Sequence, residues 1–281
     1  MEIVRKIVPP GHSVLLNIVC KAMRAIFLNV KPYANITAIV VRGSDLAPGR
    51  LSPCIHWCHL SALRLENVNF NTTILAVEFS FVLQSLSFLK DLHLSNNSIT
   101  DDFVQVWCAS LQNCTELATL DLSFNEIKQR GAGLFARIIP KIPQLKRFNI
   151  GSNNISDVGL EKLSHGFALC HALSNIDISR NTLSSGDIVA GCIVAIPQLS
   201  HVNISMNGDI FLNGSDKIAK ALQICRNLTR LELSCVQLHF RNTVQRLAAV
   251  LPGCRSLEYL SVSDNNLQDL EFEEISKALP S

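Results

Sequence analysis

A short pattern of apolar residues recurs along this chain and constrains its fold more than any other feature. Residues 117–127 read Leu-Ala-Thr-Leu-Asp-Leu-Ser-Phe-Asn-Glu-Ile, with leucine at the first, fourth and sixth places and asparagine at the ninth. Nine copies begin at residues 36, 60, 89, 117, 145, 173, 199, 228 and 257, so successive copies lie 24 to 29 residues apart. Self-similarity at such a period is typical of stacked repeats, and we expect one array of similar units.

Each copy predicts a strand followed by a helix. Within the pattern, apolar and polar residues alternate as they do in a strand with one buried face. The segments that follow, such as 101–111 and 157–167, have apolar residues at helical spacing, and Asp101 and Asp157 are suited to the start of a helix. Compact apolar residues three places before each new pattern predict a packing layer, not a redox site. They are Cys114, Ile142, Cys170, Ile196, Cys225 and Cys254.

The recurrent asparagine is predicted to have a structural role. Its amide can bond backbone groups of the turn in its own repeat and in the neighbouring repeat. Val68 and Val236 take its place in two copies, so we expect those two turns to be built differently. The asparagines of the pattern are Asn97, Asn125, Asn153, Asn181, Asn207 and Asn265.

These residues resemble the leucine-rich repeat family over residues 36–279, and the period is most similar to its ribonuclease-inhibitor-like subclass. The resemblance implies an α/β solenoid, a horseshoe with parallel β-strands on the concave face and α-helices on the convex face. We expect residues 1–35 to form an N-terminal helical segment and partial repeat, with the helix over 13–28. Residues 36–281 should hold about nine repeats of 28–29 residues, the last one cut short. The short first spacing predicts a degenerate helix between the first two strands.

Composition and charge exclude several other classes of protein. A chain of 281 residues that is 48% apolar and 17% charged is expected to fold, and a net charge of +2 argues against a dedicated nucleic-acid binder. We find no run of about 18 uncharged apolar residues, so we expect no membrane helix. The ten cysteines are predicted to be reduced thiols. Together with the lack of a convincing signal peptide, this predicts a cytoplasmic protein.

Catalytic and metal-binding patterns are weak or missing. The phosphate-binding glycine loops, the nucleophile elbow and the H-E-x-x-H zinc motif are not found. The run Cys54-Ile-His56-Trp57-Cys58-His59 contains zinc-ligand residue types, but no second pair with finger-like spacing accompanies it, and packing of an irregular repeat is the preferred interpretation. We expect no enzymatic activity, no cofactor and no metal.

Function is expected on the concave face, where the side chains between the leucines point. Aromatic and arginine anchors contribute most of the binding energy at protein interfaces. We therefore expect a protein partner to bind there. The best anchors are Phe124, Arg147, Arg180, Met206, Arg230 and Tyr259. An acidic line of Asp121, Asp177 and Glu232 and the strand histidines His93 and His201 share the same strip.

Within the subclass, the helical halves and the Cys-x-x-Leu junctions are most similar to the C-terminal repeats of NOD-like receptors, which sense ligands and restrain the receptor in innate immunity. The resemblance implies a non-catalytic protein–protein interaction module with a ligand-sensing or regulatory role. Three alternatives stay open. One is a GTPase-activating protein resembling the Ran activators, without their acidic tail. Another is a ribonuclease-inhibitor-like inhibitor, although a charge of +2 departs from that family's acidic surface. The last is an actin-regulatory scaffold of the tropomodulin type.

Overall fold

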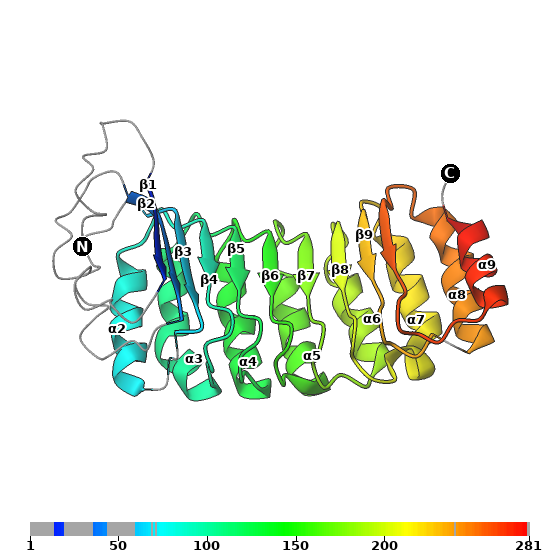
Figure 1. Ribbon diagram of the computed structural model, residues 1–281, viewed down its shortest axis with the longest axis horizontal. Coiled ribbons are helices and arrows are strands. Elements are labelled where there is room, and N and C mark those ends of the chain that lie inside the picture. The colour runs from blue at the N-terminus through cyan, green and yellow to red at the C-terminus, as the bar shows by residue number, and fades with distance from the viewer. Residues whose placement is uncertain are drawn as a thin grey trace.

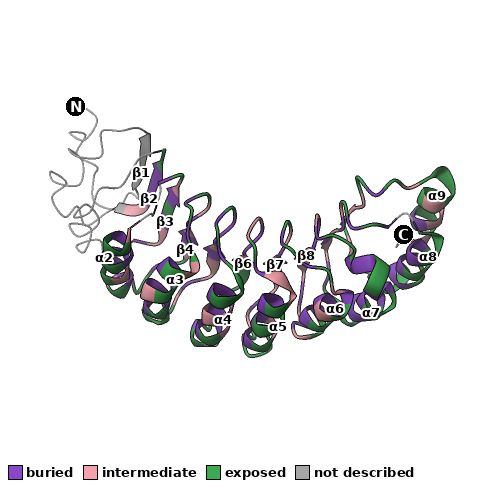
Figure 2. Cartoon of the chain, turned by 90° about the horizontal axis from the view of Figure 1, so that it is seen from below, coloured by how far each residue is buried: buried purple, intermediate pink, exposed green. Residues whose placement is uncertain are grey.

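The computed structural model describes residues 14–19, 36–43, 60–68, 70, 72–238 and 240–279. From residue 60 onward, strands and helices alternate along the chain (Figure 1), and the array curves into one open arc (Figure 2). The strands form a 10-stranded parallel sheet in which each strand pairs with the next one in the sequence. The strands line the inner side of the arc and the helices lie on its outer side (Figure 2). The expected solenoid is therefore confirmed.

Seven of the ten described strands are three residues long. Each strand from β4 to β9 buries its middle residue and leaves the flanking residues wholly or partly exposed. The strands are β1 (Val14–Val19), β2 (Ile36–Arg42), β3 (Ala62–Glu66), β4 (Asp91–His93), β5 (Thr119–Asp121), β6 (Arg147–Asn149), β7 (Asn175–Asp177), β8 (His201–Asn203), β9 (Arg230–Glu232) and β10 (Tyr259–Ser261).

Helices return the chain on the outer side after each strand from β3 onward. They are α2 (Thr73–Gln84), α3 (Asp101–Trp107), α4 (Gln129–Ile138), α5 (Ser156–Phe167), α6 (Gly186–Val194), α7 (Ile210–Ile224), α8 (Arg241–Val250) and α9 (Asp269–Ala278). Short 3₁₀ turns at Cys108–Asn113, Ile139–Lys141 and Leu251–Gly253 complete three of the returns. Thr100 caps α3 by accepting a hydrogen bond from the N–H of Phe103.

The prediction of an N-terminal helix is wrong for the residues of this segment that the structure describes. Val14–Val19 lie in strand β1, which pairs in parallel with β2. Periodicity does not separate a buried strand from a buried helix in so short an apolar run, and the edge of β2 offers unpaired backbone groups. The rest of residues 1–35 lies outside the described residues. So do the degenerate helix expected between β2 and β3 and the Cys54–His59 run.

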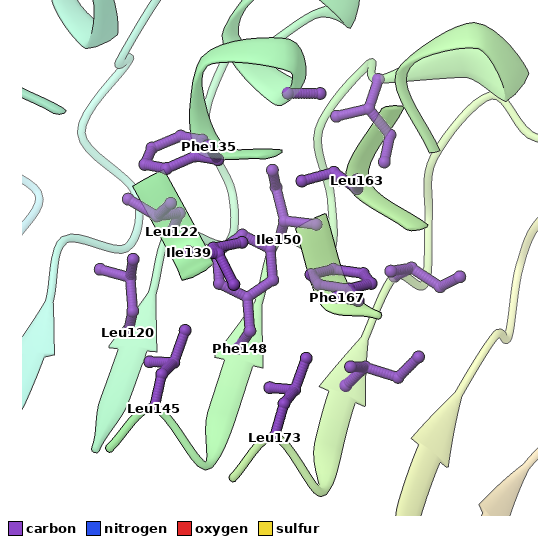
Figure 3. Close-up of a cluster of buried hydrophobic side chains, with 14 of the residues drawn as sticks. Leu120, Leu122, Phe135, Ile139, Leu145, Phe148, Ile150, Leu163, Phe167 and Leu173 are labelled. Carbon is purple, nitrogen blue, oxygen red and sulfur yellow. The ribbon is translucent and has the colours of Figure 1, made fainter. Parts of the chain in front are cut away.

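The core lies between the sheet and the helices. The middle residues of neighbouring strands face one another in register, as Leu120, Phe148 and Ile176 do, and all three are at most 1% exposed. Figure 3 shows how Phe135 and Phe167, from α4 and α5, meet Phe148 of β6. At β10, Leu260 is only partly buried, because no described strand lies beyond it.

The predicted structural role of the recurrent asparagines is confirmed, and we call this row of residues the asparagine ladder. Asn125 donates through Nδ2 to the carbonyl oxygens of Leu94 and Leu122, each at 2.9 Å. Its Oδ1 accepts from the N–H groups of Asn97 and Ile99, each at 3.0 Å. The amide thus satisfies backbone groups of two repeats inside a buried bend.

The turn at Val236 differs from the others, as expected. The valine side chain offers neither donor nor acceptor, so the contacts that the amide of Asn125 makes with its preceding repeat have no counterpart here. The N–H groups of Val236 and Leu238 themselves donate to Oδ1 of Asn265, at 2.8 and 3.3 Å. The preceding turn passes through Gly208 at φ +40°.

Glycines set the separation of two helix pairs. A Cβ at Gly166 of α5 would lie 2.5 Å from the carbonyl oxygen of Ala136 in α4. A Cβ at Gly186 of α6 would lie 2.5 Å from the Cα of Gly214 in α7. Gly214 also bends α7, because its φ of −148° is not helical. Only a residue without a side chain permits these close approaches.

Candidate functional site

The inner face of the sheet carries its side chains in rows, because the strands pair in a single register. Neighbouring members of a row lie on strands about 4.8 Å apart. The first row holds Ala62, Asp91, Thr119, Arg147, Asn175, His201, Arg230 and Tyr259. The second row holds Arg64, His93, Asp121, Asn149, Asp177, Asn203, Glu232 and Ser261.

A third row follows the strands at the place before the ladder asparagine. Its members are Asn67, Asn96, Phe124, Ser152, Arg180, Met206, Cys235 and Asp264, and all have φ between +51° and +57°. The sheet pairing continues through these residues, since the N–H of Phe124 donates to the carbonyl oxygen of Gly151 at 2.9 Å. A left-handed backbone costs about 1 kcal/mol or more for residues other than glycine, asparagine and aspartate. Phe124, Arg180 and Met206 adopt it nonetheless.

The eleven residues predicted as a binding site all lie in these rows. The first row contains Arg147, His201, Arg230 and Tyr259, the second contains His93, Asp121, Asp177 and Glu232, and the third contains Phe124, Arg180 and Met206. The register thus brings residues separated by up to 166 positions in the sequence to one face.

The acidic residues of the second row also have a structural role that the sequence analysis missed. Oδ1 of Asp121 accepts from the N–H and the hydroxyl of Ser123, at 3.0 and 2.7 Å. Asp177 holds Ser179 in the same way, at 2.9 and 2.6 Å. The signal was present in the sequence as an aspartate followed two residues later by serine, the pattern of a side chain that closes its own turn.

His93 pairs with Asp121 across β4 and β5. Nδ1 of the imidazole lies 3.4 Å from Oδ2 of the carboxylate, and both side chains are about one-fifth exposed. Burial opposes ionisation of Asp121, but hydrogen bonds from His93 and Ser123 outweigh it and lower the pKa of this carboxyl below its ordinary value. Asp121 is therefore an internally bonded carboxylate.

A second cluster spans β8, β9 and β10. Nε2 of His201 lies 3.1 Å from Oε1 of Glu232, and Nε of Arg230 donates to the same oxygen at 2.8 Å. The guanidinium of Arg230 also lies over the ring of Tyr259, 3.8 Å from its centroid. These contacts hold four of the predicted site residues in one arrangement, and leave Tyr259 43% exposed.

Three exposed side chains lie near the middle of the face. Phe124 is 58% exposed, and Arg147 and Arg180 are exposed too. Between Phe124 and Arg180 in the third row lies the smaller Ser152. Beside it, Gly151 packs closely against the second row, because a Cβ there would lie 2.9 Å from Oδ1 of Asp177.

The cysteines of the described residues are buried apart from Cys235. Burial raises the pKa of Cys114 and of Cys192 to about 12, and that of Cys225 to about 11. Thiols that stay protonated at neutral pH are poor nucleophiles and poor metal ligands. No group of three or more histidine, cysteine, aspartate or glutamate side chains with a metal-binding arrangement occurs among the described residues.

Comparison with known proteins places these repeats in context. A family model described as leucine-rich repeat matches residues 85–102, 113–136, 143–164 and 253–270. Protein NLRC5 of Ictalurus punctatus is 27% identical over 228 residues, which are 78% of this chain and 13% of that protein. RAN GTPase-activating protein 2 of Arabidopsis thaliana is 34% identical over 84 residues, 28% of this chain and 15% of that protein.

The chain thus spans less than a sixth of the length of these two relatives. Among solved structures, an internalin C2 of Listeria monocytogenes aligns at 17% identity and a TM-score of 0.45, over 82% of this chain and 72% of that one. Among the described residues, no helix combines the length and the apolar character needed to cross a bilayer.

Proposed function

Since this chain is a leucine-rich repeat protein, we propose that it is a non-catalytic module that binds a protein partner on the inner face of its sheet. One observation carries the proposal. Parallel sheets are usually covered on both faces, whereas the described helices all lie on the outer face (Figure 2). This face presents Phe124, Tyr259 and two arginines, Arg147 and Arg180, that have no side-chain partner among the described residues. These residue types anchor protein interfaces.

The variation along the rows supports this proposal further. The buried middle residues of β4 to β9 are all apolar, while the flanking first-row residues range from Asp91 through Asn175 to Arg230. A regular frame with varied exposed side chains provides a surface for specific recognition. Phe124, Arg180 and Met206 add to this, because the left-handed backbone at their positions favours smaller residues.

Photo-crosslinking from both faces tests the proposal. We would replace Tyr259 and, separately, Asn96 with benzoyl-phenylalanine on the inner face, and Val158 of α5 on the outer face. Each variant would be irradiated in cells that make the partner. Crosslinked complexes are expected from the two inner positions. Equal yields from all three positions, or complexes from Val158 alone, would overturn the inner-face site.

We further propose a regulatory or ligand-sensing role of the kind found in NOD-like receptors, in a cytoplasmic setting. The likeness to NLRC5 over 78% of the chain supports it. This role is tested by sequencing the full transcript that encodes the chain. A nucleotide-binding domain upstream in the same reading frame is expected, and an acidic tail downstream without such a domain would favour a GTPase activator instead.

The likeness to RAN GTPase-activating protein 2 favours a second candidate, stimulation of GTP hydrolysis. The purified chain would be added to a Ran-type GTPase loaded with GTP, and phosphate release measured. Under the binding-module proposal the rate stays at its intrinsic value. A stimulation that depends on the concentration of the chain would replace that proposal.

A further inference from the structure

The middle of the inner face combines small residues with large exposed ones. Phe124 and Arg180 lie two repeats apart in the third row, about 10 Å from each other at strand spacing. Ser152 and Gly151 lie between them, and Arg147 belongs to the first row of the same repeat as these two. We call these five residues the central patch.

The arginines of the central patch have no partner within the described residues. Neither Arg147 nor Arg180 forms a side-chain hydrogen bond or an ion pair there. Arg230, farther along the same face, is bound to Glu232 and stacked on Tyr259. An exposed guanidinium presents five N–H donors in a planar fork that fits a carboxylate.

The carboxylates beside the central patch are already engaged. Asp121 is held by Ser123 and His93. Asp177 is held by Ser179, and its Oδ2 also accepts from Nδ2 of Asn203 at 3.0 Å. These two carboxylates already accept hydrogen bonds from other side chains of the face, and neither is paired with Arg147 or Arg180.

We propose that the central patch binds a carboxylate-bearing segment of the partner protein, with an apolar residue of that segment against Phe124. This proposal rests on the inner-face function proposed above. Charge complementarity favours an acidic occupant for Arg147 and Arg180. A protein segment suits the patch better than a nucleic acid, because Asp121 and Asp177 interrupt the positive charge that a phosphate backbone follows.

Selection from a random peptide library tests this proposal. The library, displayed on phage, would be panned against the wild-type chain and against the double variant Arg147→Glu/Arg180→Asp. Aspartate is chosen at position 180 because it tolerates the left-handed backbone. The control Arg137→Glu/Arg226→Asp makes the same change of charge at exposed positions on α4 and before β9. Thermal unfolding followed by circular dichroism verifies that each variant is folded.

Peptides selected by the wild type are expected to be rich in Asp and Glu beside an apolar residue. Their synthetic versions should bind the double variant about 30-fold more weakly, because two charge-assisted hydrogen bonds are lost and repulsion is added. The control should stay within about twofold of wild type, since exposed charges elsewhere contribute little.

Three results would overturn the proposal, and they separate it from the function on which it rests. If the selected peptides are neutral or basic but still crosslink to positions 96 and 259, the proposal of an acidic partner is excluded and the inner-face site stands. If acidic peptides bind the wild type and the double variant with equal affinity and crosslink to position 158, both the acidic partner and the inner-face site are excluded. Displacement of the peptide by a single-stranded oligonucleotide of equal charge at the same concentration replaces the protein segment with a nucleic acid.

Discussion

Two regions of the solenoid share the same backbone repeat but differ in the side chains of their cores. In residues 60–170, the aromatic region, a chain of ring contacts links Phe70, Phe79, Phe103, Trp107, Phe135, Phe148 and Phe167. In residues 171–279, the small-residue region, aliphatic side chains predominate and Gly186 contacts Gly214 where α6 meets α7. The strand spacing of the inner face is common to both regions, so the core can change while the face keeps its geometry.

Replacing the middle residue of a strand should have the largest effect on stability, and the size of the loss should differ between the two regions. Phe148→Ala removes a side chain packed against Phe135 and Phe167, with ring centroids 6.0 and 5.6 Å away. We expect a loss of about 3–5 kcal/mol in the free energy of unfolding. Val202→Ala, at the equivalent place in β8, should cost about 2 kcal/mol. Urea unfolding of both variants measures the difference, and equal losses would mean that the ring contacts add nothing.

The glycine contact should make the small-residue region sensitive to added volume. In Gly186→Ala, the new Cβ would collide with the carbonyl oxygen of Ile210 and the backbone of Gly214. We expect a loss of about 3 kcal/mol. The matched control is Gly191→Ala in the same helix, where no heavy atom lies within 4 Å, and it should be neutral or gain up to about 1 kcal/mol. Similar melting temperatures for the two variants would contradict close packing of α6 on α7.

The asparagine ladder runs unbroken from Asn97 to Asn207 and is interrupted at Val236 in the small-residue region. Asn153 accepts from the N–H of Ile127 and donates to three carbonyl oxygens, at 2.9 to 3.2 Å. We expect Asn153→Ala to cost about 2 kcal/mol, because these backbone groups lose their partners. Asn154→Ala, at the exposed neighbour, should change stability by less than about 0.5 kcal/mol. A small effect at both sites in denaturant unfolding would show that water replaces the amide.

Buried thiols should lower the stability of the folded chain at alkaline pH. Below the ordinary thiol pKa of 9.0, both folded and unfolded chains keep Cys192 protonated, whereas above it only the unfolded chain loses the proton until the folded pKa of about 12 is reached. Stability should therefore fall between pH 9 and 12, by about 1.4 kcal/mol per pH unit for each such thiol. Cys192→Ala should reduce this slope. Cys235→Ala, at an exposed position, should leave it unchanged.

The array and the strip of inner-face residues followed from the sequence because the repeat fixes the register. Once Leu120 and Phe148 pair, Asp121 and Asn149 must pair too. Two features did not follow. The strand β1 lies in an apolar run too short for its period to be diagnostic. The side-chain hydrogen bonds within the face, such as that between His201 and Glu232, depend on side-chain rotamers across strands, which spacing along the chain does not determine.

The third row crosses both regions, and substitutions there should reveal whether the core influences it. Phe124→Asn in the aromatic region and Met206→Asn in the small-residue region place a residue suited to φ near +55° at exposed or half-exposed positions. Each should raise the free energy of unfolding by about 0.5–1 kcal/mol. Phe124→Asn should also weaken partner binding, because the apolar anchor is lost. If only one variant gains stability in denaturant unfolding, the row is coupled to the core beneath it. Equal gains would mean that the inner face can vary its side chains without regard to which core lies below, which is what a recognition surface on a repeat frame requires.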